Sequence, residues 1–208
     1  MSLFILDCGS GNSCKNDKRI IERMIKDIAE VDEGINDIVL KWQLFKSAPP
    51  NIPLDPEMFR YAYDMAERLC FETTSSIFDI ESLRYLMTFK VPFVKIANRP
   101  DLYELAQYAT VPVYVSTSVT GYHLADSRMM ACISKYPATI EEYERTFTRT
   151  ELDILSDHTV GWELYKKYMP SVIEKHFVHE RHPDNPDAGL FAVTQSELAE
   201  VINALNKV

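Results

Sequence analysis

The sequence predicts a compact (β/α)8 TIM barrel formed by a single domain over residues 1–208. Eight short apolar runs recur along the chain, and most are separated by a stretch with helical spacing of apolar residues. The runs are continuous rather than alternating in polarity, which is typical of parallel strands covered on both faces. Polar residues follow nearly every run, as expected when barrel strands end at one mouth. The predicted strands are residues 3–6, 38–40, 70–73, 93–94, 111–115, 129–133, 152–155 and 171–173.

An open doubly wound sheet is the alternative architecture for strands that alternate with helices. We favour the barrel because a ring of polar strand ends requires one shared mouth. The chain of 208 residues is shorter than the roughly 250 residues typical of this barrel, so its crossovers must be short. The connection after the fifth strand is the extreme case, because residues 116–128 are barely enough for a full crossover helix.

Helix signals fill most of the connections. Apolar residues at helical spacing predict helices over residues 20–28, 57–69, 80–87 and 102–106. Two further helices begin at capping boxes, in which a Thr is followed three residues later by a Glu. The residues that mark helix starts are Asp55 with Pro56, Asp79, Thr139 with Glu142, and Thr194 with Glu197.

Composition excludes several classes of protein. The net charge of −9 argues against non-specific attraction to nucleic acid or to an anionic membrane. The four cysteines show neither a CxxC pair nor metal-ligand spacing, so we expect reduced thiols. The first apolar run is too short for a signal peptide, and no stretch is long enough to span a bilayer. We therefore predict a cytoplasmic protein that binds neither nucleic acid nor membrane.

Two histidines follow consecutive strands and are the most informative candidates. His158 follows the seventh strand and His176 follows the eighth. A single histidine at such a place is more often a packing residue, but matching positions on neighbouring strands favour a shared role. Neutral imidazoles with a carboxylate and open coordination positions suit Mn²⁺ or a similar ion, so we predict a divalent metal held by these two residues. His179 and His182 flank a polar, proline-containing loop and are expected at the surface.

Two lysines and several hydroxyl and amide residues follow the other strands. Lys41 and Lys95 each stand within a strand-like run rather than on a helix face. Ammonium and hydroxyl groups that converge on one mouth suit a site for phosphate and carboxylate groups. A single serine at a strand end is as often structural as functional. The remaining candidates are Asp7, Gln43, Ser76, Asn98, Ser116, Ser134, Tyr136, Ser156 and Glu174.

Short motifs occur in a fixed order over nearly the whole chain. The most specific are Ser-Asp-His-Thr at 156–159 and Glu-Lys-His-Phe at 174–177. Others are Lys-Trp-Gln at 41–43, Ser-Ser-Ile-Phe-Asp at 75–79, Lys-Ile-Ala-Asn at 95–98, Ser-Thr at 116–117, Tyr-Pro at 136–137 and Pro-Asp at 186–187. Together they resemble the motifs S-D-H-T, E-K-H-F, K-F-Q, S-T-P-F-D, K-I-A-S, S-T-G, Y-P and P-D of the sialic acid synthase (N-acetylneuraminate synthase) family.

The resemblance implies a barrel that condenses phosphoenolpyruvate with an N-acetylated amino sugar or a related aldose, assisted by Mn²⁺, to give a nonulosonic-type sugar acid. It implies that His158 and His176 hold the metal and that Asp7, Glu174 and Tyr136 are catalytic. A homodimer is one candidate assembly. The residues implied around the two substrates are Lys41, Gln43, Ser76, Lys95, Asn98, Ser116, Ser134, Ser156 and Asp187.

The sequence departs from the family pattern at several of these positions. Asp7 stands where the family has Glu, so a proton-transfer carboxylate lies about an ångström short of its target. Ser76 replaces a Thr, Asn98 a Ser, and Ser134 usually an Asn. The family's carboxy-terminal antifreeze-like domain has no counterpart in residues 1–208. One alternative function is therefore a catalytically degenerate barrel that acts as a binding or regulatory subunit. Another is an enzyme that uses a different aldose, as in legionaminate-type or pseudaminate-type synthesis.

Overall fold

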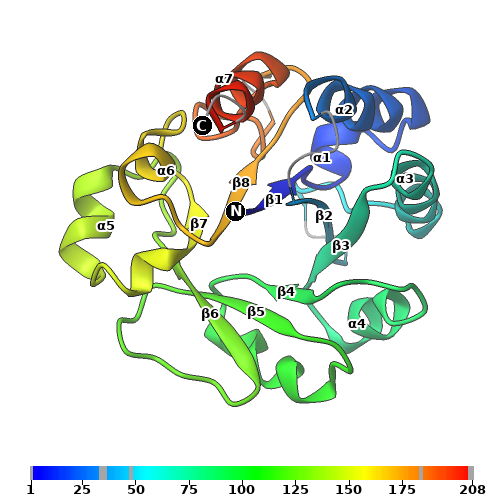
Figure 1. Cartoon of the computed structure of the whole chain (residues 1–208). Helices are drawn as coiled ribbons and strands as arrows, with labels where there is room; N and C mark the ends of the chain where they lie inside the picture. The colour runs from blue at the N-terminus through cyan, green and yellow to red at the C-terminus, as the bar shows by residue number, and fades with distance from the viewer. Residues whose placement is uncertain (1, 33–36, 47–48, 183–184, 206–208) are drawn as a thin grey trace.

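Eight parallel strands form a closed barrel in the computed structural model, which describes residues 2–32, 37–46, 49–182 and 185–205 (Figure 1). The strands are β1 (Leu3–Asp7), β2 (Asp37–Leu44), β3 (Glu72–Ile77), β4 (Val94–Ile96), β5 (Val113–Thr117), β6 (Ser127–Cys132), β7 (Ile154–Asp157) and β8 (Val172–His176). Each strand pairs in parallel with the next, and β8 pairs with β1. The predicted barrel is confirmed. The open sheet is wrong, because it would leave β1 and β8 apart.

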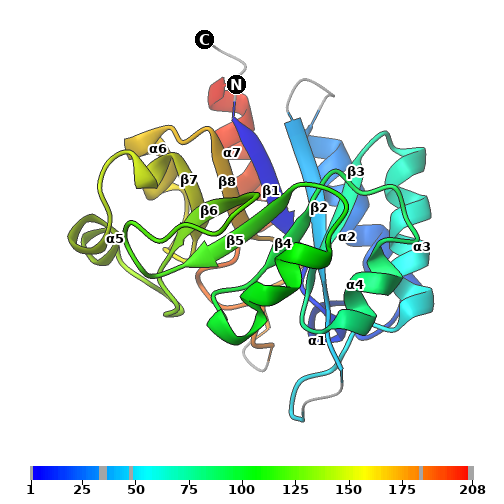
Figure 2. The same ribbon diagram turned by 90° about the horizontal axis from the view of Figure 1, so that it is seen from below.

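Helices surround the strands, as the views down the barrel and from its side show (Figures 1 and 2). They are α1 (Gly11–Cys14), α2 (Lys18–Val31), α3 (Pro56–Arg68), α4 (Ile80–Leu86), the 3-10 helix η1 (Pro100–Tyr108), α5 (Ile140–Thr146), the 3-10 helix η2 (Glu151–Asp153), α6 (Glu163–Tyr168) and α7 (Gln195–Leu205). The last helix, α7, lies beside α2 and so completes the helical ring. Between β5 and β6, residues 118–126 contain no helix, which confirms the shortened crossover.

The predicted caps determine where several helices begin. The Asp79 side chain accepts a hydrogen bond from the backbone N–H of Ser82, and the Ser82 hydroxyl reciprocates at the start of α4. Thr139 and Glu142 form the same reciprocal box at the start of α5. These contacts satisfy N–H groups that a helix start would otherwise leave unpaired. Asp55 precedes α3 as predicted but makes no side-chain capping bond.

Several predicted strand boundaries are wrong, and two of them show the reason. The third strand was expected at residues 70–73, but Cys70 has a positive φ of 64° after α3, and β3 extends instead through the polar residues to Ile77. The seventh strand was expected at residues 152–155, but η2 covers residues 151–153 and β7 continues to Asp157. In both cases pairing with neighbouring strands outweighs the local apolar pattern, because buried backbone groups must be hydrogen-bonded.

Of the three hydrophobic clusters that the described residues form in the core, the two largest are divided by the strands. Inside the barrel lies a small cluster, and the larger cluster fills the space between the strands and the surrounding helices. Successive side chains of a strand alternate between these two sides. The inner cluster consists of Ile5, Val39, Phe93, Tyr114, Met130 and Val172. We call this inner cluster the apolar plug, because it closes the barrel below the carboxyl ends of the strands. The polar residues that follow it in each strand therefore face a common mouth.

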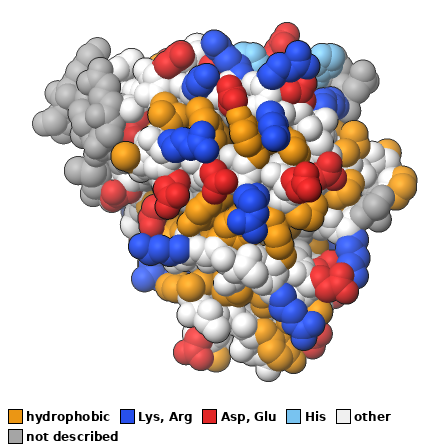
Figure 3. Space-filling view, turned by 90° about the vertical axis from the view of Figure 1, so that its right-hand side faces the viewer, with side chains coloured by type: hydrophobic (Ala, Val, Ile, Leu, Met, Phe, Trp, Pro, Cys, Tyr) orange, Lys and Arg blue, Asp and Glu red, His pale blue; other side chains and the backbone are white. Residues whose placement is uncertain are grey.

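The outer surface is charged and mixed. On the side formed by α2, α3 and α4, Lys and Arg side chains are interspersed with Asp and Glu, with hydrophobic side chains between them (Figure 3). Such interspersed charge is typical of a helical layer that faces water. Among the described helices, none combines the length and hydrophobicity needed to cross a membrane.

Candidate active site

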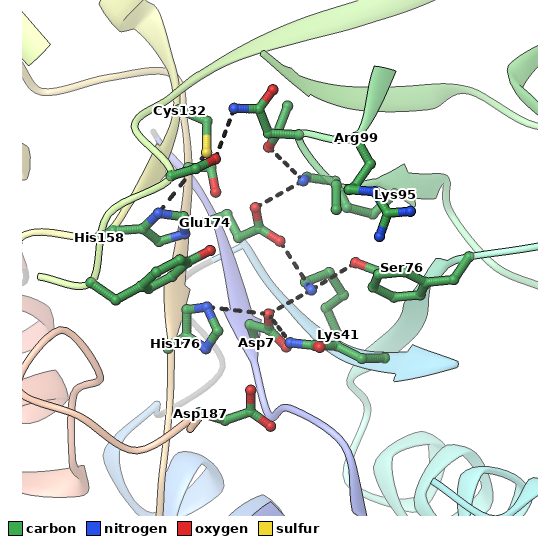
Figure 4. A pocket seen from close by; sticks show the side chains of 18 of the residues that line it. Asp7, Lys41, Ser76, Lys95, Arg99, Cys132, His158, Glu174, His176 and Asp187 are labelled. Carbon is green, nitrogen blue, oxygen red and sulfur yellow. Dashed lines mark hydrogen bonds and ion pairs between the residues drawn. The ribbon is translucent and has the colours of Figure 1, made fainter. Parts of the chain in front are cut away.

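A cavity of about 530 Å³ opens at the carboxyl ends of the barrel strands (Figure 4). All of the predicted site residues line it, from Asp7 on β1 to His176 on β8 and Asp187 beyond it. Its other lining residues are Asn51, Phe78, Ala97, Arg99, Cys132 and Pro186. The structure thus brings together side chains that are spread over nearly the whole sequence.

The strand register explains why these residues meet. Asp7 pairs with Lys41 on one side and with His176 on the other, and Ser156 pairs with Glu174. Side chains of residues that are register partners in a parallel barrel point to the same side of the sheet. Here they point into the barrel. The predicted residues that belong to strands therefore occupy inward positions above the apolar plug. The others follow the strand ends in the next segments: Asn98, Ser134, Tyr136, His158 and Asp187.

Four buried charged residues form the floor of the cavity, and we call them the charge cluster: Asp7, Lys41, Lys95 and Glu174 (Figure 4). The Lys41 ammonium lies 2.7 Å from Asp7 Oδ2 and 3.1 Å from Glu174 Oε1. The Lys95 ammonium lies 3.1 Å from Glu174 Oε2. The exposed fraction of each side chain is 6% or less. Glu174 therefore bridges two lysines that belong to different strands.

Neutral groups complete the bonding of the two lysines. Lys41 Nζ donates a hydrogen bond of 2.9 Å to Ser76 Oγ, and Lys95 Nζ donates one of 2.7 Å to Ser116 Oγ. A hydrogen bond to a hydroxyl group of the next strand thus orients each ammonium group. A bound anion in the cavity can reach these same ammonium and hydroxyl groups, which are strong hydrogen-bond donors to phosphate and carboxylate.

Asp7 is held on both carboxylate oxygens. Its Oδ1 accepts a hydrogen bond from the backbone N–H of Gly9 at 2.9 Å, and its Oδ2 accepts one from Gln43 Nε2 at 2.9 Å. The same Oδ2 contacts Lys41 and lies 3.7 Å from His176 Nε2. Asp7 therefore links the charge cluster to one of the two predicted metal ligands.

Both carboxyl groups of the charge cluster are ionised at neutral pH. Burial alone would raise the pKa of Glu174, but the ammonium groups of Lys95 and Lys41 hold the pKa of this carboxyl well below its usual range. Burial would also raise the pKa of Asp7, yet Lys41 and His176 bring that pKa below its usual value. Burial would lower the pKa of Lys41, but Asp7 and Glu174 raise it. Mutual charge thus outweighs desolvation in this cluster.

Asn98 connects the loops that follow β4, β5 and β6. Its Nδ2 donates a hydrogen bond of 2.8 Å to Ser134 Oγ and also contacts Ser118. Tyr103, on η1, donates to the backbone carbonyl of Ser116 at 2.7 Å. These contacts hold the wall of the cavity opposite Asp7, and they place an amide and a hydroxyl above Lys95.

The two predicted metal-ligating imidazoles lie side by side, with ring centroids 5.6 Å apart. His158 Nδ1 lies 2.8 Å from the carbonyl oxygen of Ile133, a contact that places the proton on Nδ1 and leaves the Nε2 lone pair free. His176 Nδ1 is buried without a hydrogen-bond partner within the described residues. Tyr136 stacks on His158 at 4.2 Å, and Phe191 meets His176 edge-on at 5.0 Å.

This donor set fits a divalent metal through two nitrogen ligands. A free Nε2 lone pair on His158 and an unpartnered Nδ1 on His176 are what an imidazole pair must offer an ion. No group of three or more His, Cys, Asp or Glu within the described ranges is arranged to hold a metal. The described residues would therefore offer such an ion two ligands, and its other coordination positions would stay open to substrate oxygens and water.

Residues 40–208 match the sequence model of the NeuB family. The chain belongs to the NeuB family. The predicted resemblance to sialic acid synthases is thereby confirmed at the level of the family. A curated relative, an uncharacterized protein of Methanocaldococcus jannaschii, is 26% identical over an alignment of 193 positions. The alignment covers 80% of this chain and 56% of the relative, so the chain spans little more than half of the relative's length.

Solved structures share the barrel of this NeuB-family chain. One is an N-acetylneuraminic acid (sialic acid) synthetase from Leptospira borgpetersenii, with a TM-score of 0.75, 18% identity, and coverage of 99% of this chain and 83% of that chain. Another is a putative spore coat polysaccharide biosynthesis protein E from Chromobacterium violaceum, with a TM-score of 0.76, 18% identity, and coverage of 100% and 74%. At this identity the likeness shows the fold.

Asp187 joins the site of this NeuB-family barrel from the segment between β8 and α7. Its Oδ2 accepts hydrogen bonds from Ser10 Oγ at 3.1 Å and from Ser13 Oγ at 3.3 Å. These bonds attach the segment to the loop after β1, at the edge of the mouth. Gly9, with a φ of +75°, lies beneath the carboxylate, where a Cβ atom would approach Asp187 Oδ2 to 2.8 Å.

Two residues that line the cavity and carry a charged or nucleophilic group, Arg99 and Cys132, are absent from the sequence predictions. Arg99 follows Asn98 directly and pairs with Asp101 at the rim, so its position after a polar strand end was the available signal. Cys132 is the last residue of β6, where it reads as one more apolar residue of the run. Burial would raise the pKa of the Cys132 thiol, but His158, 4.0 Å from its sulfur, brings that pKa below its usual value.

Proposed function

We propose that this NeuB-family barrel is a phosphoenolpyruvate-dependent transferase that forms a carbon–carbon bond. It condenses phosphoenolpyruvate with an N-acetylated amino sugar, or a related aldose, to a nonulosonic-type sugar acid. One observation carries the proposal: two buried lysines and two neighbouring imidazoles face the same cavity. The lysines would neutralise the charge of an anionic enol ester. The imidazoles would hold the metal that activates an aldehyde beside it.

The lysine side of the cavity suits phosphoenolpyruvate. Lys41 and Lys95 offer two positive charges, and Ser76 and Ser116 add hydroxyl groups directly beside them. Phosphate and carboxylate groups bind most strongly to such charge-assisted donors in a site shielded from water. A volume of about 530 Å³ lies within the range typical of pockets for small molecules. Ser134 and Asn98, bonded to each other on the opposite wall, complete the polar lining around the ligand.

The imidazole side of the cavity suits the aldehyde of an open-chain sugar. His158 and His176 would hold the divalent metal, which we propose to be Mn²⁺. When bound, such an ion acts as a Lewis acid that polarises a carbonyl oxygen. Tyr136, stacked on His158, and Asp187, at the edge of the mouth, are placed to contact the hydroxyl groups of the sugar.

The charge cluster would handle the protons of the reaction. In the proposed sequence the enol carbon of phosphoenolpyruvate bonds to the aldehyde carbon, water adds to C2, and phosphate leaves as its bond to C2 breaks. The water loses both of its protons overall: one balances the proton gained by the aldehyde oxygen, and the other leaves with the phosphate as C2 becomes a ketone. Asp7 and Glu174 are ionised carboxylates, so either can accept a proton from water, and Lys41 and Lys95 offset the charge of the departing phosphate.

The proposal includes a cytoplasmic location and a homodimer as the assembly to be tested. All four cysteines are free thiols in the structure, and three of them are buried. Free cysteines are typical of a reducing compartment. Size-exclusion chromatography with light scattering measures the assembly directly.

The function is tested by measuring phosphate release. Purified protein is incubated with Mn²⁺, phosphoenolpyruvate and each member of a panel of N-acetylated hexosamines and related aldoses. We expect phosphate release that depends on one class of aldose and disappears in Lys95→Met. Lys135→Met is the matched control, because Lys135 is an exposed lysine bonded to Glu142 outside the cavity. Phosphoenolpyruvate binding without phosphate release from any aldose favours a binding or regulatory subunit instead.

A further inference from the structure

A buried ion pair outside the charge cluster lies beside the active site but is not part of its lining. Lys175 Nζ is 3.0 Å from Asp157 Oδ2, and the exposed fractions of the two side chains are 1% and 0%. The two residues are register partners on β8 and β7. They alternate along these strands with Glu174 and Ser156, which face the cavity, so the pair lies on the outer side of the barrel wall.

The pair encloses the short turn that carries His158. Asp157 Oδ1 accepts hydrogen bonds from the backbone N–H and from the hydroxyl group of Thr159, both at 2.7 Å. Lys175 Nζ donates to the carbonyl oxygen of Thr159 at 2.6 Å. The ammonium of Lys175 thus contacts the residue before His158 and the residue after it. His176 is the next residue after Lys175, so one lysine ties together the backbones that carry both imidazoles.

Stability alone does not account for such a pair. Burial lowers the pKa of Lys175, although Asp157 opposes this shift. Replacing a buried ion pair with apolar residues of similar volume is often neutral or stabilising. Apolar residues cannot reproduce the directional hydrogen bonds of this pair. Asp157 and Lys175 make four of them, and these bonds fix the turn at residues 157–159 against β8.

The imidazoles need this support from their backbones. In most metal sites, each histidine is oriented by a hydrogen bond from its second ring nitrogen. His158 has such a bond to Ile133. With Nδ1 of His176 facing the ion, the second ring nitrogen of this residue is Nε2, which lies 3.7 Å from Asp7 Oδ2, too far for a hydrogen bond. The placement of the His176 ring therefore depends on packing against Phe191 and on the strand that carries it.

We infer that Asp157 and Lys175 are positioning residues that preset the separation of the His158 and His176 imidazoles. Without the pair, the turn at residues 157–159 gains freedom and the two rings no longer share one arrangement. One consequence of this inference is a preformed site for a divalent cation, and that consequence rests on the proposed function. The ring positions themselves do not depend on it.

The test uses the double variant Asp157→Asn/Lys175→Met, which removes both charges and leaves neither unpaired. The matched control is Asp27→Asn/Arg23→Met, the same kinds of change at an ion pair of α2 whose carboxylate is also buried. Because Asp27 also contacts His179 Nδ1 at 2.6 Å, the His179 signal should move in this control, and only the His158 and His176 signals are compared. Imidazole signals of the metal-free proteins are recorded in long-range ¹H–¹⁵N spectra. Mn²⁺ and phosphoenolpyruvate affinities are then measured by calorimetry.

We expect the His158 and His176 signals to shift or broaden in the double variant and not in the control. Mn²⁺ affinity should fall about 10- to 100-fold, the range known for residues that support metal ligands. Phosphoenolpyruvate affinity should stay within about twofold, because the pair does not touch Lys41 or Lys95, and a general loss of structure would lower both. Unchanged imidazole signals and Mn²⁺ affinity in the folded double variant overturn the inference.

A milder variant keeps the test decisive if the double variant does not fold. Thr159→Val preserves shape and removes the hydroxyl bond to Asp157, so it should move the His158 signal in the same direction by less. A His158 signal that stays in place overturns the inference. If wild-type protein binds no Mn²⁺, the metal consequence is wrong, and the imidazole spectra still decide the positioning. Absence of phosphate release with perturbed spectra counts against the proposed function alone.

Discussion

Lys41 and Glu174 form an ion pair of 3.1 Å although their strands, β2 and β8, are separated by β1. The contact is made across the inside of the barrel, above the apolar plug, and Asp7 on the intervening strand contacts Lys41 from below (Figure 4). The charge cluster is therefore a tertiary feature of the closed barrel. An anion that enters the cavity must share these lysines with the two carboxylates.

The first prediction concerns the affinity for phosphoenolpyruvate. Lys95→Met should weaken binding about 10- to 100-fold, because hydrogen bonds to charged groups contribute about 1.5–3 kcal/mol. Isothermal titration calorimetry in the absence of metal measures this affinity. Lys135→Met should bind like the wild type. Equal affinity of Lys95→Met and wild type contradicts a phosphoenolpyruvate site on the cavity floor.

The second prediction concerns the metal. The double variant His158→Ala/His176→Ala should remove Mn²⁺ binding measured by calorimetry, because it deletes both nitrogen ligands that the protein supplies. The fold should survive, since both rings lie at the mouth rather than in the apolar plug. His179→Ala and His182→Ala are the controls, because these histidines line a separate cavity of about 270 Å³. Retained Mn²⁺ affinity in the double variant would remove the two-histidine site.

The third prediction concerns the acid at the end of β1. Both oxygens of Asp7 are occupied by Gly9, Gln43 and Lys41, so the site is built around the shorter acid. Asp7→Glu should therefore lower turnover, because the extra methylene moves the carboxylate away from these partners. Asp7→Ala should lower turnover by orders of magnitude and change phosphoenolpyruvate affinity far less. Steady-state kinetics with calorimetry separates the two effects, and full turnover of Asp7→Ala would exclude Asp7 from the chemistry.

The fourth prediction concerns stability and pH. The pKa values of Asp7 and Glu174 in the folded protein lie below their unfolded values of about 4. Their charges therefore stabilise the fold above about pH 4, and this contribution is lost as the pH falls through the folded-state values. The pKa of Lys41 is raised, so its contribution is present below about pH 10 and is lost as the pH rises past its folded-state value.

Urea unfolding between pH 7 and pH 2 measures the acid side of this dependence. The free energy of unfolding should fall as the pH decreases below about 4. Glu174→Gln should show a shallower fall, because one of the two depressed carboxyl groups is gone. The same slope in wild type and variant would show that Glu174 does not carry the predicted linkage.

Much of the site was predictable because successive side chains of a strand point alternately to the two sides of the sheet, so the sequence indicates which residues share a side. Lys41 and Glu174 each stand within an apolar run, and a charged residue in such a run must face something other than the core. The closed barrel then brings the strand ends to one mouth. This is why residues as distant in sequence as Asp7 and His176 could be assigned to one site before their register was known.

The remainder depends on contacts that no local pattern contains. The polar stretch of β3 reads as a loop, and only its pairing with β2 and β4 makes Ser76 a strand residue. Cys132 reads as an apolar residue, and its contact with His158 comes from strand order. Asp157 and Lys175 belong to the two most specific motifs, but neither motif indicates a partner for them. That they pair with each other follows from the β7–β8 register.

The central claim, condensation of phosphoenolpyruvate with an aldose in this cavity, is tested most directly by following the carbon atoms. Protein with Mn²⁺ is incubated with uniformly ¹³C-labelled phosphoenolpyruvate and the aldose that supports phosphate release, and the products are analysed by mass spectrometry. We predict one sugar acid that contains the intact aldose and all of the labelled carbon, formed in equal amount to the phosphate. Labelled pyruvate in place of the sugar acid, or no consumption of phosphoenolpyruvate with any aldose, would contradict the account.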